Sequence, residues 1–375
     1  MLRIGFDAKR AFLNNTGLGN YSRSVITSLA SSFPENEYFL YTTKQINNSR
    51  TAGMLDRPGV IIRTPAIPIL KSLWRSRFVV NCLIKDEIDL YHGLSHEIPV
   101  AIQNTSIKTV VTIHDLIFLR YPQYYKPADR KIYEMKFRNA CKNANKIIAI
   151  SEQTKRDIIH YFGTDEAKIE VVYQSCDPSF AQKYTADHLT GIKEKYRLPE
   201  KFLLNVGTIE DRKNLMLIVK ALSEVPEEIK LVVIGKETPY AGKVKKYLSE
   251  HQLENRVILL KDIPFHDLPA IYQLAKIFIY PSEFEGFGIP VLEALNAGVP
   301  VIAATGSCLE EAGGPSSLYV PPTDHKALAK AVNNILQDSR LGEDMIVAGK
   351  LYAEQFKENA HAENLMRIYK NLLAR

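Results

Sequence analysis

The sequence has few of the residues that build metal sites, disulfide scaffolds or membrane spans. Its 375 residues include four cysteines, and Cys82, Cys141, Cys176 and Cys308 lack the paired spacing of a zinc site. No apolar run is long enough to span a bilayer, and the N-terminus leads into a strand pattern without a signal peptide. We therefore expect a cytoplasmic protein with reduced cysteines, with the inner face of the membrane as an alternative location.

Neither positive nor negative charge is in large excess. The formal net charge of +6 is modest for this length, and the sequence has no zinc finger, aromatic-rich RNA-binding motif or dense basic tract. We therefore expect no nucleic-acid partner. Residues 67–80 interleave cations with apolar residues and contain the only tryptophan, Trp74, which fits an interfacial helix or an ordinary domain helix equally. Peripheral membrane association is thus an open prediction.

Strand-like and helix-like segments alternate along the whole chain. This alternation is typical of parallel α/β sheets, and a hydrophobic content of 46% is enough for two buried cores. The clearest strand patterns are residues 2–8, 106–116, 146–150, 202–209, 231–235, 277–280 and 299–303. A polar stretch from about residue 178 to 200 lacks an apolar period and predicts a boundary between domains at residues 1–180 and 200–358.

Two glutamates, Glu285 and Glu293, flank a glycine-rich turn into a predicted helix. Gly286 and Gly288 permit unusual backbone angles, and Pro290 suits the first helical position. Glu285 should therefore lie in the loop and Glu293 in the first helical turn. Because unpaired N–H groups favour anions there, the pattern predicts a pocket for a phosphorylated sugar. A solvated loop glutamate and an ordinary helix-start glutamate are the alternative.

The frame EGFGIPVLEALNAGVPVIA at residues 285–303 closely resembles retaining glycosyltransferases of family 4. The resemblance implies that Glu285 contacts the donor sugar, and is catalytic, while Glu293 binds the ribose of a nucleoside diphosphate sugar. It also implies donor contacts from the rest of the turn, at Gly286, Phe287, Gly288 and Ile289.

A second strand-to-helix junction precedes this one. The strand pattern at 202–209 ends in Gly207 and Thr208, and Arg212 and Lys213 follow where ligands of open α/β sheets bind. The letters G-T-x-x-x-R-K-N resemble the family turn, which implies that Gly207 and Thr208 bind the donor and that the two cations neutralise a leaving diphosphate. A solvent-facing basic pair is the alternative, although cations in a first helical turn oppose the dipole.

The two cations bear on metal use, because a leaving diphosphate is stabilised either by a divalent ion or by fixed side chains. The sequence has no Asp-x-Asp motif, and Glu87-Ile88-Asp89 is more simply the start of a strand. We therefore predict a reaction without metal or other cofactor.

In the first half, the strand pattern at 106–116 ends in His114 and Asp115, where catalytic groups belong in this architecture. The segment HDLIFLRYPQYY resembles the mannosyltransferase-like branch of the family. The resemblance implies catalytic roles for both residues, with His114 near the transferring sugar; a structural role is the alternative. His92 and His96 could line the acceptor site or cap a loop.

Further donor contacts are implied by the resemblance alone. Gly17 and Gly19 lack the full dinucleotide fingerprint, which argues against a nicotinamide site. They resemble the family's first glycine-rich loop, where the backbone approaches the donor phosphates or the acceptor. Ile263 lies in a segment where relatives hold the nucleotide base through backbone groups.

The resemblance covers nearly the whole chain and implies the α/β GT-B fold, in which two Rossmann-like domains face each other across a cleft. The first domain would bind the acceptor, the second the nucleotide sugar, and residues 359–375 would pack back on the first. The implied function is retaining transfer of a hexosyl group, with GDP-mannose favoured, to a glycan or lipid-linked glycan in cell-surface polysaccharide synthesis. A family 4 transferase that uses UDP-glucose or UDP-N-acetylglucosamine, a GT-B epimerase or hydrolase, and a silent scaffold are the alternatives.

Overall fold

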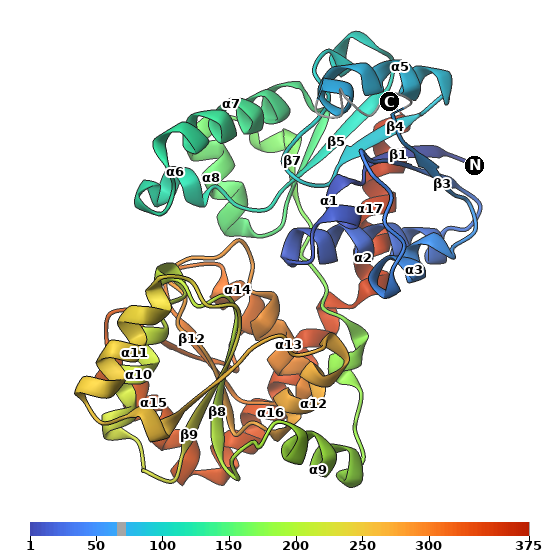
Figure 1. Cartoon of the computed structure of the whole chain (residues 1–375). Coiled ribbons are helices and arrows are strands. Elements are labelled where there is room, and N and C mark those ends of the chain that lie inside the picture. Colours follow the sequence, from blue (N-terminus) through green and yellow to red (C-terminus); the bar gives the residue numbers. More distant parts are fainter. Residues whose placement is uncertain (66–72, 375) are drawn as a thin grey trace. The chain divides into compact units, whose positions relative to one another are not determined.

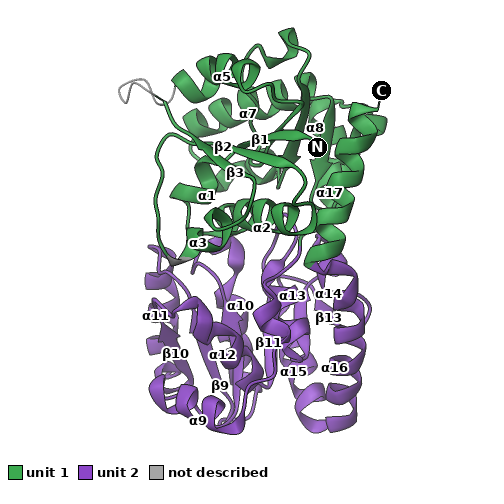
Figure 2. Cartoon of the chain, turned by 90° about the vertical axis from the view of Figure 1, so that its right-hand side faces the viewer, with its two compact units in different colours: residues 1–174, 358–375 green, residues 175–357 purple. Residues whose placement is uncertain are grey.

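The computed structural model describes residues 1–65 and 73–374, and the chain divides into two compact units. Unit 1 comprises Met1–Gln174 and Glu358–Arg375, and unit 2 comprises Ser175–Lys357 (Figure 2). The first unit boundary therefore lies after Gln174, just before the polar stretch at about 178–200 where the sequence predicted it. That stretch forms helix α9 (Ala186–Lys195) of unit 2, because Ile192 and Leu198 supply buried apolar anchors that a periodic pattern does not show.

Unit 1 is built on a parallel sheet, which has seven strands within the described residues, in the order β3-β2-β1-β4-β5-β6-β7 (Figure 1). The strands are β1 (Arg3–Asp7), β2 (Glu37–Tyr41), β3 (Val60–Arg63), β4 (Leu90–Gly93), β5 (Lys108–Ile113), β6 (Lys146–Ala149) and β7 (Ile169–Val171). The central strands are apolar and buried because helices cover both faces, as parallel sheets require. The strand order reverses between β1 and β4, and their carboxyl ends flank a switch point.

The α-helices of unit 1 pack on both faces of this sheet. They are α1 (Lys9–Leu13), α2 (Gly17–Ser32), α3 (Ser49–Leu55), α5 (Val79–Lys85), α6 (Ile117–Arg120), α7 (Pro127–Asn143), α8 (Glu152–Phe162) and α17 (Glu358–Leu373). Helix α17, from the C-terminus, lies against α2 near the N-terminus (Figures 1 and 2). Its apolar face is buried, and the Tyr369 hydroxyl lies 2.5 Å from Nδ1 of His92.

Unit 2 repeats this plan with a parallel sheet of six strands among the described residues, in the order β10-β9-β8-β11-β12-β13. The strands are β8 (Phe202–Val206), β9 (Lys230–Ile234), β10 (Val257–Leu260), β11 (Ile277–Tyr280), β12 (Val301–Ala304) and β13 (Leu318–Val320). With α9, the helices are α10 (Leu215–Ala221), α11 (Tyr240–Glu250), α12 (Leu268–Leu274), α13 (Ile289–Ala297), α14 (Leu309–Gly313), α15 (His325–Gln337) and α16 (Ser339–Ala353). The predicted α/β class with parallel sheets is confirmed.

The basic, apolar segment at 67–80 lies partly outside the described residues, which resume at residue 73. Trp74 is 9% exposed and packs in the core of unit 1 beside Phe39 and Tyr41, so the tryptophan is not an interfacial anchor. Leu73 and Phe78 are each 43% exposed. Across the described ranges, we find no helix that is both long and apolar enough to cross a bilayer.

Candidate active site

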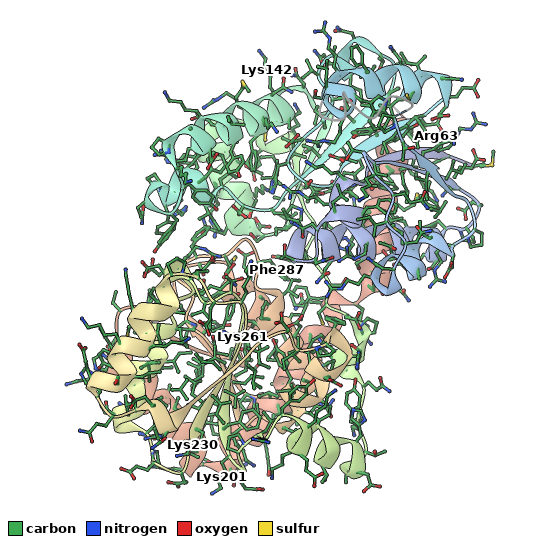
Figure 3. All side chains as sticks on the ribbon, viewed as in Figure 1. Arg63, Lys142, Lys201, Lys230, Lys261 and Phe287 are labelled. Atoms are coloured by element: carbon green, nitrogen blue, oxygen red, sulfur yellow. The ribbon has the colours of Figure 1, made fainter. Side chains whose placement is uncertain are left out.

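In unit 2, the predicted site residues meet at the switch point of the sheet. Arg212 and Lys213 follow β8 in a short turn at Asp211–Lys213, and Glu285 follows the neighbouring strand β11. The strand order reverses between β8 and β11, so the residues after both strands share the crevice where ligands of such sheets bind. Figure 3 shows Phe287, two residues after Glu285, at the opposite end of unit 2 from Lys201 and Lys230, which lie at the starts of β8 and β9.

Glu285 is held through one oxygen only. Its Oε1 lies 2.9 Å from Nη1 of Arg212 and 3.2 Å from Nζ of Lys213, and it accepts hydrogen bonds from Ser282 at 2.8 Å and Tyr280 at 3.0 Å. No described residue forms a hydrogen bond or ion pair with Oε2, and the side chain is 14% exposed. One carboxylate oxygen is therefore fixed by four donors while the other is available to a ligand.

The charge of Glu285 follows from these contacts. Burial alone would raise its pKa, but the cations of Lys213 and Arg212 and the two hydroxyls lower the pKa to about 2. Glu285 is thus a carboxylate at neutral pH. It can accept a hydrogen bond from a ligand hydroxyl, and it cannot act as a proton donor.

The two cations are paired before any ligand binds. Arg212 also contacts Glu210, 2.7 Å from Nη2, and donates to the Phe284 carbonyl oxygen, while Lys213 donates to the Tyr280 hydroxyl at 2.6 Å. Burial would lower the pKa of Arg212 and of Lys213, but Glu285 raises both above their ordinary values. Both side chains are therefore fixed cations in a partly dehydrated site.

Several residues that position this site were not singled out from the sequence. Asn214 adopts a left-handed backbone conformation, with φ of 56°, and its amide donates to the carbonyls of Pro281 and Pro322. The Glu283 amide donates to the Arg212 carbonyl at 2.9 Å, which joins the two loops directly. The available signals were Tyr280 and Ser282, polar residues at the end of a buried strand, and the asparagine after the basic pair.

Glycines shape both loops as predicted for a turn that departs from ordinary backbone angles. Gly288 has φ of 120°, and an added Cβ would lie 2.8 Å from Leu309. Gly207 has φ of 148°, and an added Cβ would lie 3.1 Å from the Lys213 side chain. Both positions therefore require glycine, and Gly207 also leaves the space that Lys213 occupies.

Glu293 lies one residue beyond the first helical turn in which it was predicted. Helix α13 begins at Ile289, so Glu293 is its fifth residue rather than part of the first turn, and Pro290 is its second residue. Glu293 accepts a hydrogen bond from the buried Tyr272 hydroxyl at 2.8 Å. Burial raises the pKa of Glu293 to about 7, partly opposed by the Tyr272 bond. Glu293 therefore titrates near neutrality.

The other donor contacts predicted for unit 2 lie on or beside its loops. Thr208 follows β8, and Ile263 lies in the loop after β10. Gly286 lies in the turn between β11 and α13, and the Phe287 ring is buried 5.5 Å from that of Phe356. The Phe287 side chain is therefore not available to a ligand.

In unit 1, the His114 ring is fully engaged by the protein. Nε2 lies 2.9 Å from the Leu94 carbonyl and therefore carries the proton, while Nδ1 lies 3.1 Å from the Gln174 side-chain amide and accepts from it. Burial lowers the pKa of His114 to about 4. The ring is therefore neutral at pH 7, and its tautomer is fixed by two internal hydrogen bonds.

The other polar residues near this strand end make hydrogen bonds or ring contacts within unit 1. His92 is buried between Tyr369 and Thr112, and His96 stacks on Phe137 with ring centroids 4.2 Å apart. Asp115 accepts a hydrogen bond from the Ile117 amide at 3.1 Å. His92 does not cap a loop, because it lies in β4 and both of its ring nitrogens are bonded within unit 1.

The two first-loop glycines differ, and the expected loop is the start of a helix. Gly17 and Gly19 form the first turn of α2. An added Cβ at Gly17 would meet nothing within 4 Å, whereas at Gly19 it would lie 1.9 Å from the Asn14 carbonyl oxygen and 3.1 Å from that of Arg10. Gly19 therefore has a packing requirement between α1 and α2, in addition to any contact with a ligand.

The reaction without a metal ion stays a prediction. Within residues 1–65 and 73–374, no group of three or more His, Cys, Asp and Glu side chains is arranged to hold a metal ion.

Comparison with known proteins matches both units. Residues 23–180 match the model of Glycosyltransferase Family 4, and residues 191–352 match that of Glycosyl transferases group 1. O-antigen chain mannosyltransferase B of Escherichia coli is 28% identical over 95% of this chain and 96% of that protein. Sucrose-phosphate synthase from Thermosynechococcus elongatus (TM-score 0.79, 22% identity, 100% of both chains) and Anabaena HepE with UDP-glucose (TM-score 0.78, 16% identity, 99% and 100%) share the fold.

The two sheets and their switch-point residues define a GT-B glycosyltransferase. The chain belongs to glycosyltransferase family 4 and is a hexosyltransferase.

Proposed function

We propose that the chain transfers a mannosyl group from GDP-mannose to an acceptor hydroxyl, with retention of anomeric configuration, in the synthesis of a cell-surface or lipid-linked glycan. The observation that carries the proposal is the Glu285 carboxylate, which is fixed through Oε1 beside two cations and has no bond at Oε2 from any residue that the structure describes. The name of the Escherichia coli relative, an O-antigen chain mannosyltransferase, supports both the sugar and the kind of product.

In this mechanism the donor diphosphate lies beside Arg212 and Lys213. The bond between the anomeric carbon and the diphosphate oxygen breaks, and the acceptor oxygen bonds to the anomeric carbon on the same face. The departing diphosphate oxygen takes the proton of the acceptor hydroxyl. Because the cations are already fixed and partly dehydrated, they stabilise the developing charge without reorganising. Glu285 Oε2 accepts from a sugar hydroxyl and orients the ring.

Glu293 completes the donor site as the acceptor of hydrogen bonds from the ribose hydroxyls. It is the fifth residue of α13, just beyond the first turn, and Tyr272 fixes its Oε2. The charge of the leaving group is met by side chains, so the reaction would proceed without a divalent ion or other cofactor.

The acceptor side of the proposal concerns unit 1. His114, with its neutral ring held by Leu94 and Gln174, would present its backbone and the edge of its ring to the transferring sugar. The exposed Leu73 and Phe78 support a peripheral position at the cytoplasmic face of a membrane that carries a lipid-linked acceptor.

Calorimetric titration in EDTA tests the donor assignment. We compare GDP-mannose, UDP-glucose and UDP-N-acetylglucosamine, of which GDP-mannose should bind selectively. The affinity for GDP-mannose should fall about tenfold or more in Glu293→Ala. Glu237→Ala, a carboxylate paired with Lys245 and Lys261 on unit 2, is the control. NMR of the product should show a retained anomer. Selective binding of a UDP sugar, or an inverted product, would overturn the corresponding part of the proposal.

A further inference from the structure

A second cationic cluster lies at the switch point of unit 1. Lys9 and Arg10 follow β1, and His96 and His114 follow the next two strands of the sheet, β4 and β5. The charge of Arg10 lowers the pKa of both histidines after burial has already lowered it, which places the guanidinium near them. These residues therefore share the crevice outside the carboxyl ends of the central strands.

The side chains of these two cations lack a partner in the part of the chain that the structure describes. Among the described residues, no side chain or carbonyl forms an ion pair or hydrogen bond with the side chain of Lys9 or Arg10, although both are less than fully exposed. Burial and the nearby charges of Arg75 and Arg10 lower the pKa of Lys9. Half-buried cations without counter-charges are costly, so the arrangement favours an anion from outside the chain.

The nearest carboxylates are occupied by other cations. Arg75 bridges Asp7 and Glu97, with 2.7 Å to each, and Lys136 lies 3.0 Å from the second oxygen of Glu97. The cluster thus has four cations, Lys9 and Arg10 included, against these two carboxylates. The excess of two positive charges matches the charge of a phosphate monoester or a diphosphate.

We propose that Lys9 and Arg10 bind a phosphate or diphosphate group of the acceptor. The proposal rests on the proposed function, because it names the chemical class of the acceptor for the same transfer reaction. Arg10 offers a planar fork that matches two phosphate oxygens, and Lys9 adds a compact charge beside it. The group could belong to a lipid-linked diphosphate or to a soluble sugar phosphate, which share this chemistry.

Calorimetric titration with inorganic pyrophosphate tests the site. The calorimetric titration is made in an Arg212→Ala background, which weakens the other cationic site. In the otherwise native chain, pyrophosphate binding is followed by the fluorescence of Trp74. Trp74 is the only tryptophan and precedes Arg75 of the cluster. Arg10→Ala and Lys9→Ala should each weaken binding about ten- to hundredfold, and Arg10→Lys should restore part of it. Lys44→Ala, an exposed cation of the same unit, should have no effect.

Farnesyl diphosphate and mannose 6-phosphate then distinguish a lipid acceptor from a soluble one, since the physiological class should bind more tightly than pyrophosphate. Binding of pyrophosphate that is insensitive to Arg10→Ala would overturn the proposal. An equal loss of GDP-mannose affinity in Arg10→Ala would also overturn it, because the anion would then belong to the donor. Failure of the native chain to bind any sugar nucleotide would instead count against the proposed donor, and leaves the pyrophosphate result to be judged separately.

Discussion

The two switch points of this enzyme have the same topology but differ in charge balance, which is even in unit 2 and positive in unit 1. In each unit a basic pair follows a central strand: Lys9 and Arg10 after β1, and Arg212 and Lys213 after β8. In unit 2 a carboxylate from the next strand in the sheet, Glu285, pairs with both cations. In unit 1 the carboxylate of the corresponding loop, Glu97, pairs with Arg75 and Lys136, and the basic pair has no partner within residues 1–65 and 73–374.

The difference shows what each pair is suited to do. Cations that are held by an internal carboxylate have fixed positions. They can stabilise charge that develops during a reaction without moving. Cations without a partner gain most from a ligand that carries its own charge. The same topology thus provides a preorganised reaction site in unit 2 and a site for an anionic substrate in unit 1.

The largest effect should come from removing the carboxylate that distinguishes the two clusters. Glu285→Gln leaves the buried Lys213 without a counter-charge and Arg212 with Glu210 alone, which should lower the free energy of unfolding by about 3–5 kcal/mol. Turnover should fall about a hundred- to thousandfold, because the cations and the sugar lose their fixed geometry. Denaturant unfolding and steady-state kinetics measure the two effects, with Glu237→Gln as the control. Activity equal to that of the control would contradict the role of Glu285.

Sequence patterns predicted the strands and the glycine-rich turn of the unit 2 site because these depend on local signals. A glycine-rich turn after an apolar run places Glu285 at a sheet edge whatever surrounds it. The four donors on Oε1 were not predictable in the same way, because Tyr280 and Ser282 reach it only through the tertiary arrangement of β8 and β11. Trp74 shows the same limit: its sequence neighbours left an interfacial helix and an ordinary domain helix equally open, and tertiary packing buries the ring.

Gly19 and Gly17 form a matched pair that tests how unit 1 holds its basic residues in place. Gly19→Ala would force a Cβ against the Asn14 carbonyl, and should lower the free energy of unfolding by about 1–3 kcal/mol by separating α1 from α2. Gly17→Ala has open space and should raise it by up to about 1 kcal/mol, since alanine favours the helix.

Thermal and denaturant unfolding of the two variants make this comparison. Because α1 contains Lys9 and Arg10, Gly19→Ala should also weaken pyrophosphate binding, and Gly17→Ala should not. Equal stability of the two variants would show that the contact with Asn14 is relieved by a small shift, and that Gly19 has no packing role.

The smallest effect concerns Glu293, the carboxylate of unit 2 that has a hydroxyl in place of a cation as its partner. Its pKa of about 7 lies above the ordinary 4.5, so the folded state holds this proton more tightly than the unfolded state. The stabilisation from that proton is therefore fully present below pH 4.5 and is lost as the pH rises through 7.

Donor binding should have the opposite dependence, because the ribose requires the ionised carboxylate. The dissociation constant measured by calorimetry should rise about fivefold from pH 7 to pH 6, and it should approach the one-proton limit of about tenfold per pH unit at lower pH. Tyr272→Phe removes the hydrogen bond that lowers the pKa of Glu293, so the same transition should move to higher pH. In Glu293→Gln the dependence should disappear. A profile that Tyr272→Phe leaves in place would assign the proton to another group, and Glu293 would then resemble Glu285 in being charged throughout the neutral range.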